Sequence, residues 1–310
     1  MGKSRAGVYL SVILAMIFWG FTFVAYKIAN ESFRPITIVF LRLFVSIFFL
    51  FGFAILLKRL KKIRTKDQKW FLLMALFEPF FYFLGEAYGL TMVTATVGAV
   101  IISTIPLLIP FAAYLLYREK LTLLNRIGLV VSFAGVLMVI LAKSQGMAAQ
   151  PKGILLMFVA VISAVGYTML VKKLVDDYNP ITITAYQSFY GLLMFIPLFL
   201  ILELPVLDIK AASASSQLAV IFMGVFGSGI CFILLTIGVR ELGAAKANVF
   251  VNLIPVVTAI VSYFLLKESM PLLKILGILV VIGGLLMSQL SGLGTKKSTR
   301  KESFQHPPYS

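Results

Sequence analysis

The strongest constraint on the fold is a succession of ten apolar runs, each about 20 residues long, the length at which an α-helix crosses a bilayer core. Short polar stretches separate the runs and hold most of the charged residues. The runs cover residues 7–28, 36–57, 70–90, 95–117, 124–142, 153–173, 181–203, 217–239, 246–267 and 271–290. This pattern predicts an all-α integral membrane protein with ten transmembrane helices.

Composition supports lipid as the solvent of this chain. Hydrophobic residues make up 60% of it and charged residues only 13%, with a mean hydropathy of +1.01. A soluble protein is about one quarter charged. The single cysteine, Cys231, and the single histidine, His306, exclude a disulfide framework and a Cys/His metal site, so we expect no metal and no cofactor. The net charge of +16 does not indicate nucleic-acid binding, because the charges lie at the ends of apolar runs.

The placement of Lys and Arg predicts the orientation, because positively charged loops stay on the cytoplasmic side. With the N-terminus inside, 20 of the 28 Lys and Arg residues fall on the inner side. The largest inner cluster is "KRLKKIRTKDQK", residues 58–69. We therefore expect both termini to be cytoplasmic and residues 291–310 to form a disordered cytoplasmic tail. Anchoring to anionic lipid is the simpler role for the basic runs, and a nucleic-acid or regulatory patch is the alternative.

An internal repeat divides the chain in two. Pro106 and Pro255, Tyr114 and Tyr263, and Glu119 and Glu268 are each 149 positions apart. Nearer the start of each half, "WGFTFVAYK" (19–27) aligns with "VGYTMLVKK" (165–173) at an offset of 146. The halves, residues 7–142 and 153–290, each hold five spans. Since five is odd, the second half starts on the other side of the membrane, which predicts two inverted five-helix repeats, as in many secondary transporters.

The same residues resemble the drug/metabolite transporter superfamily, in particular its EamA branch. The resemblance lies in Trp19–Gly20 in the first span, Arg42 in the second, the Pro106 helix that ends in Glu119, and the Pro255 helix that ends in Glu268. It implies a central cavity between two five-helix halves and the transport, often the export, of amino acids or other small metabolites. Two positions depart from the repeat, because Trp19 aligns with Val165 and Arg42 with Gln187.

The third span carries the best candidates for substrate binding or coupling. Glu78, Tyr82 and Glu86 share one helical face at about 100° per residue, and Glu78 lies near mid-membrane. Charged groups at such depth usually face a cavity. Glu78 is either a functional carboxylate, acting on an amino-bearing substrate or a coupling proton, or a structural carboxyl beside Pro79. Arg42 is predicted at a depth similar to that of Glu86, so the two form either a cavity ion pair or a structural neutralisation.

Weaker candidates lie in other spans. They are Trp19, Tyr186, Gln187, Asn248 and Asn252, each of which is also suited to bridging helices by hydrogen bonds. The prolines Pro106 and Pro255 are candidates for helix breaks that line a cavity, or for simple kinks.

The sequence holds no phosphate-binding loop, no HExxH and no nucleophile elbow, so we expect no enzyme activity. Without an ATP motif, uphill transport would use a gradient, through proton or substrate antiport. The predicted function is secondary transport of a small molecule across the cytoplasmic (plasma) membrane by alternating access. The alternative is a passive channel or a membrane receptor, which the inverted duplication disfavours.

Overall fold

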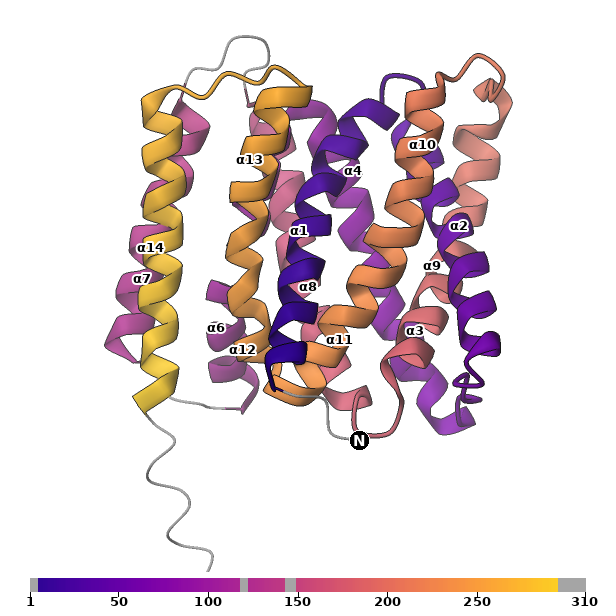
Figure 1. The fold of residues 1–310 in the computed structure, drawn as a ribbon, viewed down its shortest axis with the longest axis horizontal. Helices are drawn as coiled ribbons and strands as arrows, with labels where there is room; N and C mark the ends of the chain where they lie inside the picture. Colours follow the sequence, from indigo (N-terminus) through magenta and orange to yellow (C-terminus); the bar gives the residue numbers. More distant parts are fainter. Residues whose placement is uncertain (1–4, 118–121, 143–148, 295–310) are drawn as a thin grey trace, which may run out of the picture.

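The structure, a computed structural model, describes residues 5–117, 122–142 and 149–294, and all regular structure in these ranges is helical (Figure 1). Within them, 6 helices are long and apolar enough to cross a membrane: 6–29, 35–56, 65–92, 151–174, 180–202 and 214–242. Four shorter apolar helices cover 95–109, 126–141, 250–265 and 272–287. The all-helical, membrane-spanning character is as predicted. The arrangement as ten spans in two inverted repeats stays a prediction, since four of the ten runs form shorter helices.

The first half begins with two uninterrupted helices and continues with two interrupted ones. Its elements are α1 (Arg5–Ala29), α2 (Pro35–Leu56), the 3-10 turn η1 (Thr65–Asp67), α3 (Gln68–Ala75), the π-helical η2 (Leu76–Phe81), α4 (Tyr82–Met92), α5 (Ala95–Ile102), α6 (Ile105–Tyr117) and α7 (Leu123–Leu141). Glu119 follows α6 and lies outside the described residues.

The second half repeats this succession. Its elements are α8 (Pro151–Leu174), α9 (Pro180–Leu202), the 3-10 turn η3 (Leu204–Val206), α10 (Ala214–Phe222), the π-helical η4 (Met223–Ile230), α11 (Cys231–Leu242), α12 (Ala244–Asn248), the 3-10 turn η5 (Val249–Asn252), α13 (Leu253–Leu265) and α14 (Leu272–Gly294). α14 continues to Gly294, four residues into the expected tail, and His306 lies outside the described residues.

Helices begin where the polar stretches end, and the local sequence explains several of these starts. Proline occupies the first position of α2, α8 and α9, where its missing N–H costs no hydrogen bond. The Asn179 side chain accepts a hydrogen bond of 2.9 Å from the Thr182 amide at the start of α9. Thr94 caps α5 in the same way through the amide of Val97, at 3.3 Å.

The two halves are interrupted at equivalent places. η2 at 76–81 corresponds, 149 positions on, to 225–230, which lies within η4. Ser103, in the break between α5 and α6, corresponds to Asn252 at the end of η5. A single helix was expected over 70–90. It is interrupted because Pro79 has no N–H to donate and Glu78 leaves the helical conformation, with φ −146° and ψ 116°.

α7 and α14 pack against each other at one side of the bundle (Figure 1). Glycines allow their close approach. A Cβ on Gly284 would lie 2.5 Å from the backbone nitrogen of Ser132, and one on Gly135 would lie 2.6 Å from that of Val281. Small residues at such a contact let helix backbones approach in lipid, where the hydrophobic effect does not drive helices together.

The bundle has two ends. α1 begins and α14 ends at the same end, to which the connection from α2 to α3 also belongs, and we call it the terminal face (Figure 1). α1 ends, α5 begins and α13 connects to α14 at the other end, the opposite face. The charge distribution assigns the terminal face to the cytoplasm, and this assignment stays a prediction.

Candidate functional site

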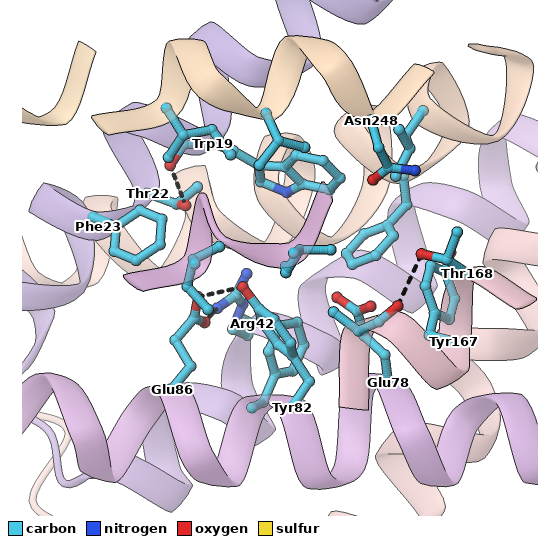
Figure 2. Close-up of a pocket in the computed structure, with 18 residues that line it drawn as sticks. Trp19, Thr22, Phe23, Arg42, Glu78, Tyr82, Glu86, Tyr167, Thr168 and Asn248 are labelled. Carbon is cyan, nitrogen blue, oxygen red and sulfur yellow. Dashed lines mark hydrogen bonds and ion pairs between the residues drawn. The ribbon is translucent and has the colours of Figure 1, made fainter. Parts of the chain in front are cut away.

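A cavity is lined by side chains from both halves of the chain (Figure 2). The space inside it that a water-sized sphere can occupy is about 50 Å³. Its lining consists of Trp19, Thr22, Phe23, Arg42, Glu78, Tyr82, Phe83, Glu86, Ile102 and Ile105 from the first half, and Ala164, Tyr167, Thr168, Phe232, Leu235, Asn248, Val251 and Ile254 from the second. Aromatic and aliphatic walls with a few charged groups are typical of a small-molecule site.

Arg42 projects from α2 into this cavity and is only 3% exposed. Its Nε donates a hydrogen bond of 2.9 Å to Ser228 Oγ in η4, and its Nη1 lies 3.5 Å from Glu86 Oε2. The guanidinium carbon lies 4.1 Å from the centre of the Phe83 ring. A buried cation needs such partners, because its desolvation is costly.

Glu86 is held from two sides. Besides Arg42, it contacts Tyr82 one helical turn earlier in α4, whose hydroxyl donates to Glu86 Oε1 at 3.0 Å. Positions four residues apart lie on the same helical face, which explains this contact. The stripe predicted in the third span therefore includes a bonded pair on the cavity wall.

Glu78 differs from Glu86 in having no such partners. It lies at the break in η2, is 6% exposed and turns its carboxyl group toward the cavity (Figure 2). Among the described residues, Glu78 makes neither a hydrogen bond nor an ion pair. The hydrogen-bonding capacity of this buried carboxyl group is therefore not used by the described residues.

Trp19 joins α1 to the interrupted helix of the second half. Its indole Nε1 donates a hydrogen bond of 3.0 Å to the carbonyl oxygen of Gly227, within η4. Its ring meets Phe232 edge-on, with 5.2 Å between the ring centres. A π-helical segment departs from the regular i→i−4 hydrogen bonding of an α-helix. In η4, the carbonyl oxygen of Gly227 accepts a hydrogen bond from Trp19, which lines the cavity.

The second half contributes hydroxyl and amide groups. Tyr167 of α8 lines the cavity and donates its hydroxyl to Gln187 Oε1 at 3.1 Å. Asn248 at the end of α12 also lines the cavity, and its Nδ2 donates to the carbonyl oxygen of Ala244 at 2.9 Å. In the described part of the chain, no group of three or more His, Cys, Asp or Glu side chains is placed to hold a metal ion.

Much of the lining comes from equivalent positions of the two halves. Five pairs line the cavity together: Thr22 with Thr168 at an offset of 146, and Phe83 with Phe232, Glu86 with Leu235, Ile102 with Val251 and Ile105 with Ile254 at 149. The cavity is therefore built on the internal repeat.

Charge does not follow this symmetry. Arg42, Glu78 and Glu86 supply the charges of the lining, and all three belong to the first half. Their second-half counterparts are Gln187, Gly227 and Leu235, which carry no charge. The lining positions are therefore equivalent in the two halves, but the charged side chains come from the first half alone.

The structure brings together only part of the predicted set. Trp19, Arg42, Glu78, Tyr82, Glu86 and Asn248 line the cavity, whereas Tyr186, Gln187, Asn252, Pro106 and Pro255 do not. Gln187 lies behind the wall and reaches it through Tyr167. The Asn252 amide is buried without a hydrogen-bond partner among the described residues. Ile105 and Ile254, which immediately precede the two prolines, are lining residues.

The sequence prediction missed several lining residues, above all Thr22, Tyr167, Thr168 and Phe232. The signal for two of them was present, since the aligned segments 19–27 and 165–173 both carry threonine at the same place. Tyr167 lies in the second of these segments, directly before Thr168, which lines the cavity together with its aligned partner Thr22.

Comparison with known proteins gives a consistent assignment. The sequence profile described as the EamA-like transporter family matches twice, over residues 6–141 and 151–290. The chain is 27% identical over 290 residues to the uncharacterized transporter YetK of Bacillus subtilis (strain 168), covering 92% of this chain and 88% of that protein. It is also 27% identical over 281 residues to an uncharacterized transporter of Archaeoglobus fulgidus, covering 89% and 96%.

A solved crystal structure shares the fold. It superposes with a TM-score of 0.69 at 16% sequence identity and covers 93% of this chain and 98% of its own. At this identity the likeness concerns the fold alone. The two profile matches span both halves, and the relatives are named as transporters. The chain is therefore a multi-pass membrane transporter that belongs to the EamA-like transporter family.

Proposed function

We propose that this protein is a secondary transporter that exports small amino-bearing metabolites, such as amino acids, across the cytoplasmic membrane by alternating access. The central cavity is the substrate site. Export agrees with the predicted cytoplasmic terminal face, from which the substrate would be loaded.

The observation that carries this proposal is the asymmetric charge in a symmetric cavity. Glu78 faces the cavity without a bonding partner among the described residues, whereas Glu86 is held by Arg42 and Tyr82. An unpaired carboxyl group in an apolar site attracts a cationic ligand, because an ammonium group would neutralise it there. The aromatic walls around it suit the rest of a small organic molecule.

Alternating access accounts for the duplication better than a channel or receptor does. In transporters with inverted repeats, the site lies at the interface of the two halves, and one half moves against the other around it. The cavity here has lining from both halves at equivalent positions. Energy would come from a gradient, through antiport of protons or of a second substrate, since the sequence contains no ATP-binding motif.

The test is flux in proteoliposomes. Purified protein is reconstituted and screened with labelled amino acids, nucleosides and amines, with and without unlabelled solute on the other side. We expect saturable uptake that is accelerated by internal substrate, which a channel does not show. Glu78→Gln should weaken uptake of amino-bearing solutes or remove its pH dependence, whereas Glu31→Gln, at an exposed position, should leave uptake unchanged. Flux that never saturates, or no flux of any tested solute, would contradict the proposal.

A further inference from the structure

Two lysines from different halves approach the ring of Trp70 at the terminal face. The Nζ atom of Lys69 lies 5.3 Å from the ring centre, and that of Lys173 lies 3.3 Å from it. Lys69 and Trp70 lie at the start of α3, whereas Lys173 lies in the last turn of α8. An aromatic ring attracts cations to its face, so Trp70 holds two positive charges close to one point.

The carboxylates near these lysines in the sequence do not neutralise them. Asp67 and Asp177 both pair with Arg64, at 2.6 and 2.7 Å. In the described part of the chain, Asp176 and the two lysines at Trp70 form no ion pair. The ring is therefore flanked by an excess of positive charge, which favours an anionic ligand.

Lys173 ends an exposed stripe of α8. At about 100° per residue, one face of this helix carries Leu155, Val159, Ile162, Gly166, Met169 and Lys173. All six are exposed or partly exposed, and the other residues from 160 to 171 are buried. From Leu155 to Lys173 the stripe rises about 27 Å at about 1.5 Å per residue, close to the thickness of a hydrocarbon core. Its apolar part is therefore placed to contact lipid, and its lysine to reach the headgroup region.

α3 and η2 run beside this stripe in the opposite direction. Phe77, seven residues after Trp70, packs on Gly166, seven residues before Lys173, because a Cβ on Gly166 would lie 2.7 Å from the Phe77 ring. The two contacts are thus about two helical turns apart. Leu73, between Trp70 and Phe77, is 36% exposed. Acyl chains that lie along these two segments would place a phosphate group at the Trp70 ring.

The equivalent place in the second half lacks these residues. Lys69 and Trp70 align at the offset of 149 with Leu218 and Ala219 in α10, which are apolar. Tryptophan is frequent at the boundary between hydrocarbon and headgroups, and lysine is frequent on the cytoplasmic side. The ring with its two lysines is therefore not a product of the internal repeat.

We infer that Lys69, Trp70 and Lys173 bind the phosphate headgroup of an anionic phospholipid in the leaflet at the terminal face. Both ammonium groups donate to the phosphate oxygens, the indole ring keeps the two lysines in place, and the acyl chains lie along the exposed stripe of α8. Attraction between basic runs and anionic lipid is otherwise diffuse, whereas here charges from two halves converge on one ring. The site requires neither the proposed substrate nor alternating access.

The test uses brominated phospholipids, which quench the fluorescence of a nearby tryptophan. The chain has two tryptophans, so Trp19→Phe leaves Trp70 as the reporter. The full chain is reconstituted in vesicles in which brominated phosphatidylglycerol competes with unbrominated phosphatidylcholine, and in the reverse mixture. We expect phosphatidylglycerol to be selected at Trp70 by about fivefold or more, since each lysine near a membrane surface strengthens binding of anionic lipid by about fivefold.

Lys69→Gln together with Lys173→Gln should lower this selection to less than about twofold. The matched control is Lys61→Gln together with Lys62→Gln, which removes the same charge from exposed lysines of the same face and should keep the parental selection. Leu218→Trp, in a chain without the two native tryptophans, places a reporter at an exposed position of the opposite face and should show no selection.

Equal losses in the two lysine pairs, or no selection in the parental chain, would overturn the site, because the effect would then be the general charge of the face. Inorganic phosphate should compete no better than chloride at the same ionic strength, and stronger competition would assign the lysines to a soluble phosphate instead of a lipid. If Trp19→Phe does not fold, native mass spectrometry of the parental chain and the two lysine pairs replaces fluorescence. Retained phosphatidylglycerol should then be lost only without Lys69 and Lys173.

Discussion

Arg42 and Glu86 form a buried ion pair across the cavity wall, with Arg42 Nη1 at 3.5 Å from Glu86 Oε2. The two residues lie on α2 and α4, and Ser228 of η4 holds the other side of the guanidinium at 2.9 Å. The pair therefore connects the two helices that carry the charges to the interrupted helix of the second half.

Removing one partner of this pair should be costly. Arg42→Ala or Glu86→Gln leaves a buried polar group without its partner, and we expect each to lower the free energy of unfolding by on the order of 3 kcal/mol. The double variant should lose less than the sum of the two. Thermal unfolding of the detergent-solubilised protein, followed as a double-mutant cycle, measures the coupling, and additive losses would show that the two side chains do not interact.

Glu78→Gln should preserve the fold and weaken transport. The change conserves shape at a position without a bonded partner in the described structure, so the unfolding temperature should stay near the parental value. Binding of amino-bearing solutes should fall by about tenfold, which corresponds to about 1.4 kcal/mol, or the pH dependence of transport should disappear. Parental rates with a parental pH profile would make Glu78 structural and direct the search to Trp19 and Tyr82.

The orientation can be tested with single cysteines in a Cys231→Ala background. Lys62→Cys lies between α2 and α3 at the terminal face, and Lys152→Cys lies at the start of α8 at the opposite face; both side chains are exposed. In intact cells, an impermeant maleimide should label only Lys152→Cys. Labelling of Lys62→Cys from outside would reverse the predicted topology.

The contact between α7 and α14 offers a matched pair of glycines. A Cβ at Gly284 would lie 2.5 Å from the Ser132 backbone nitrogen, whereas one at Gly283 meets nothing within 4 Å. Gly284→Val should destabilise the protein by about 1–3 kcal/mol, as overpacking does, because backbone cannot yield as a side chain can. Gly283→Val should leave the unfolding temperature near parental. Equal effects at both positions would refute a close contact.

The sequence alone was enough to predict the membrane class, whereas the arrangement as two inverted repeats stays a prediction. Apolar runs of bilayer length with charges at their ends indicate that the chain folds in a lipid bilayer. This prediction depends only on the order of apolar and charged residues along the chain. The interruptions at η2 and η4 lie in register at the offset of 149, but the sequence predicted uninterrupted spans over 70–90 and 217–239, and only Pro106 and Pro255 were candidates for helix breaks.

Tertiary structure decided which side chains meet in the cavity. Asn248 and Asn252 are four residues apart and share a face of a regular α-helix, but only Asn248 lines the cavity. The 3-10 winding of η5 between them turns the chain by about 120° per residue instead of about 100°, which carries Asn252 to another side.

Helix breaks had a similar effect on the charged groups. The sequence placed Glu78 and Glu86 on one stripe, yet only the break at Glu78 explains why its carboxyl group faces the cavity alone while Glu86 is held by Arg42. The hydrogen bond from Trp19 to Gly227 joins residues 208 positions apart. The periodicity of one helix predicts which of its residues share a face. A contact between residues as far apart in sequence as Trp19 and Gly227 depends on how the two halves pack, and the sequence pattern within one helix does not determine that packing.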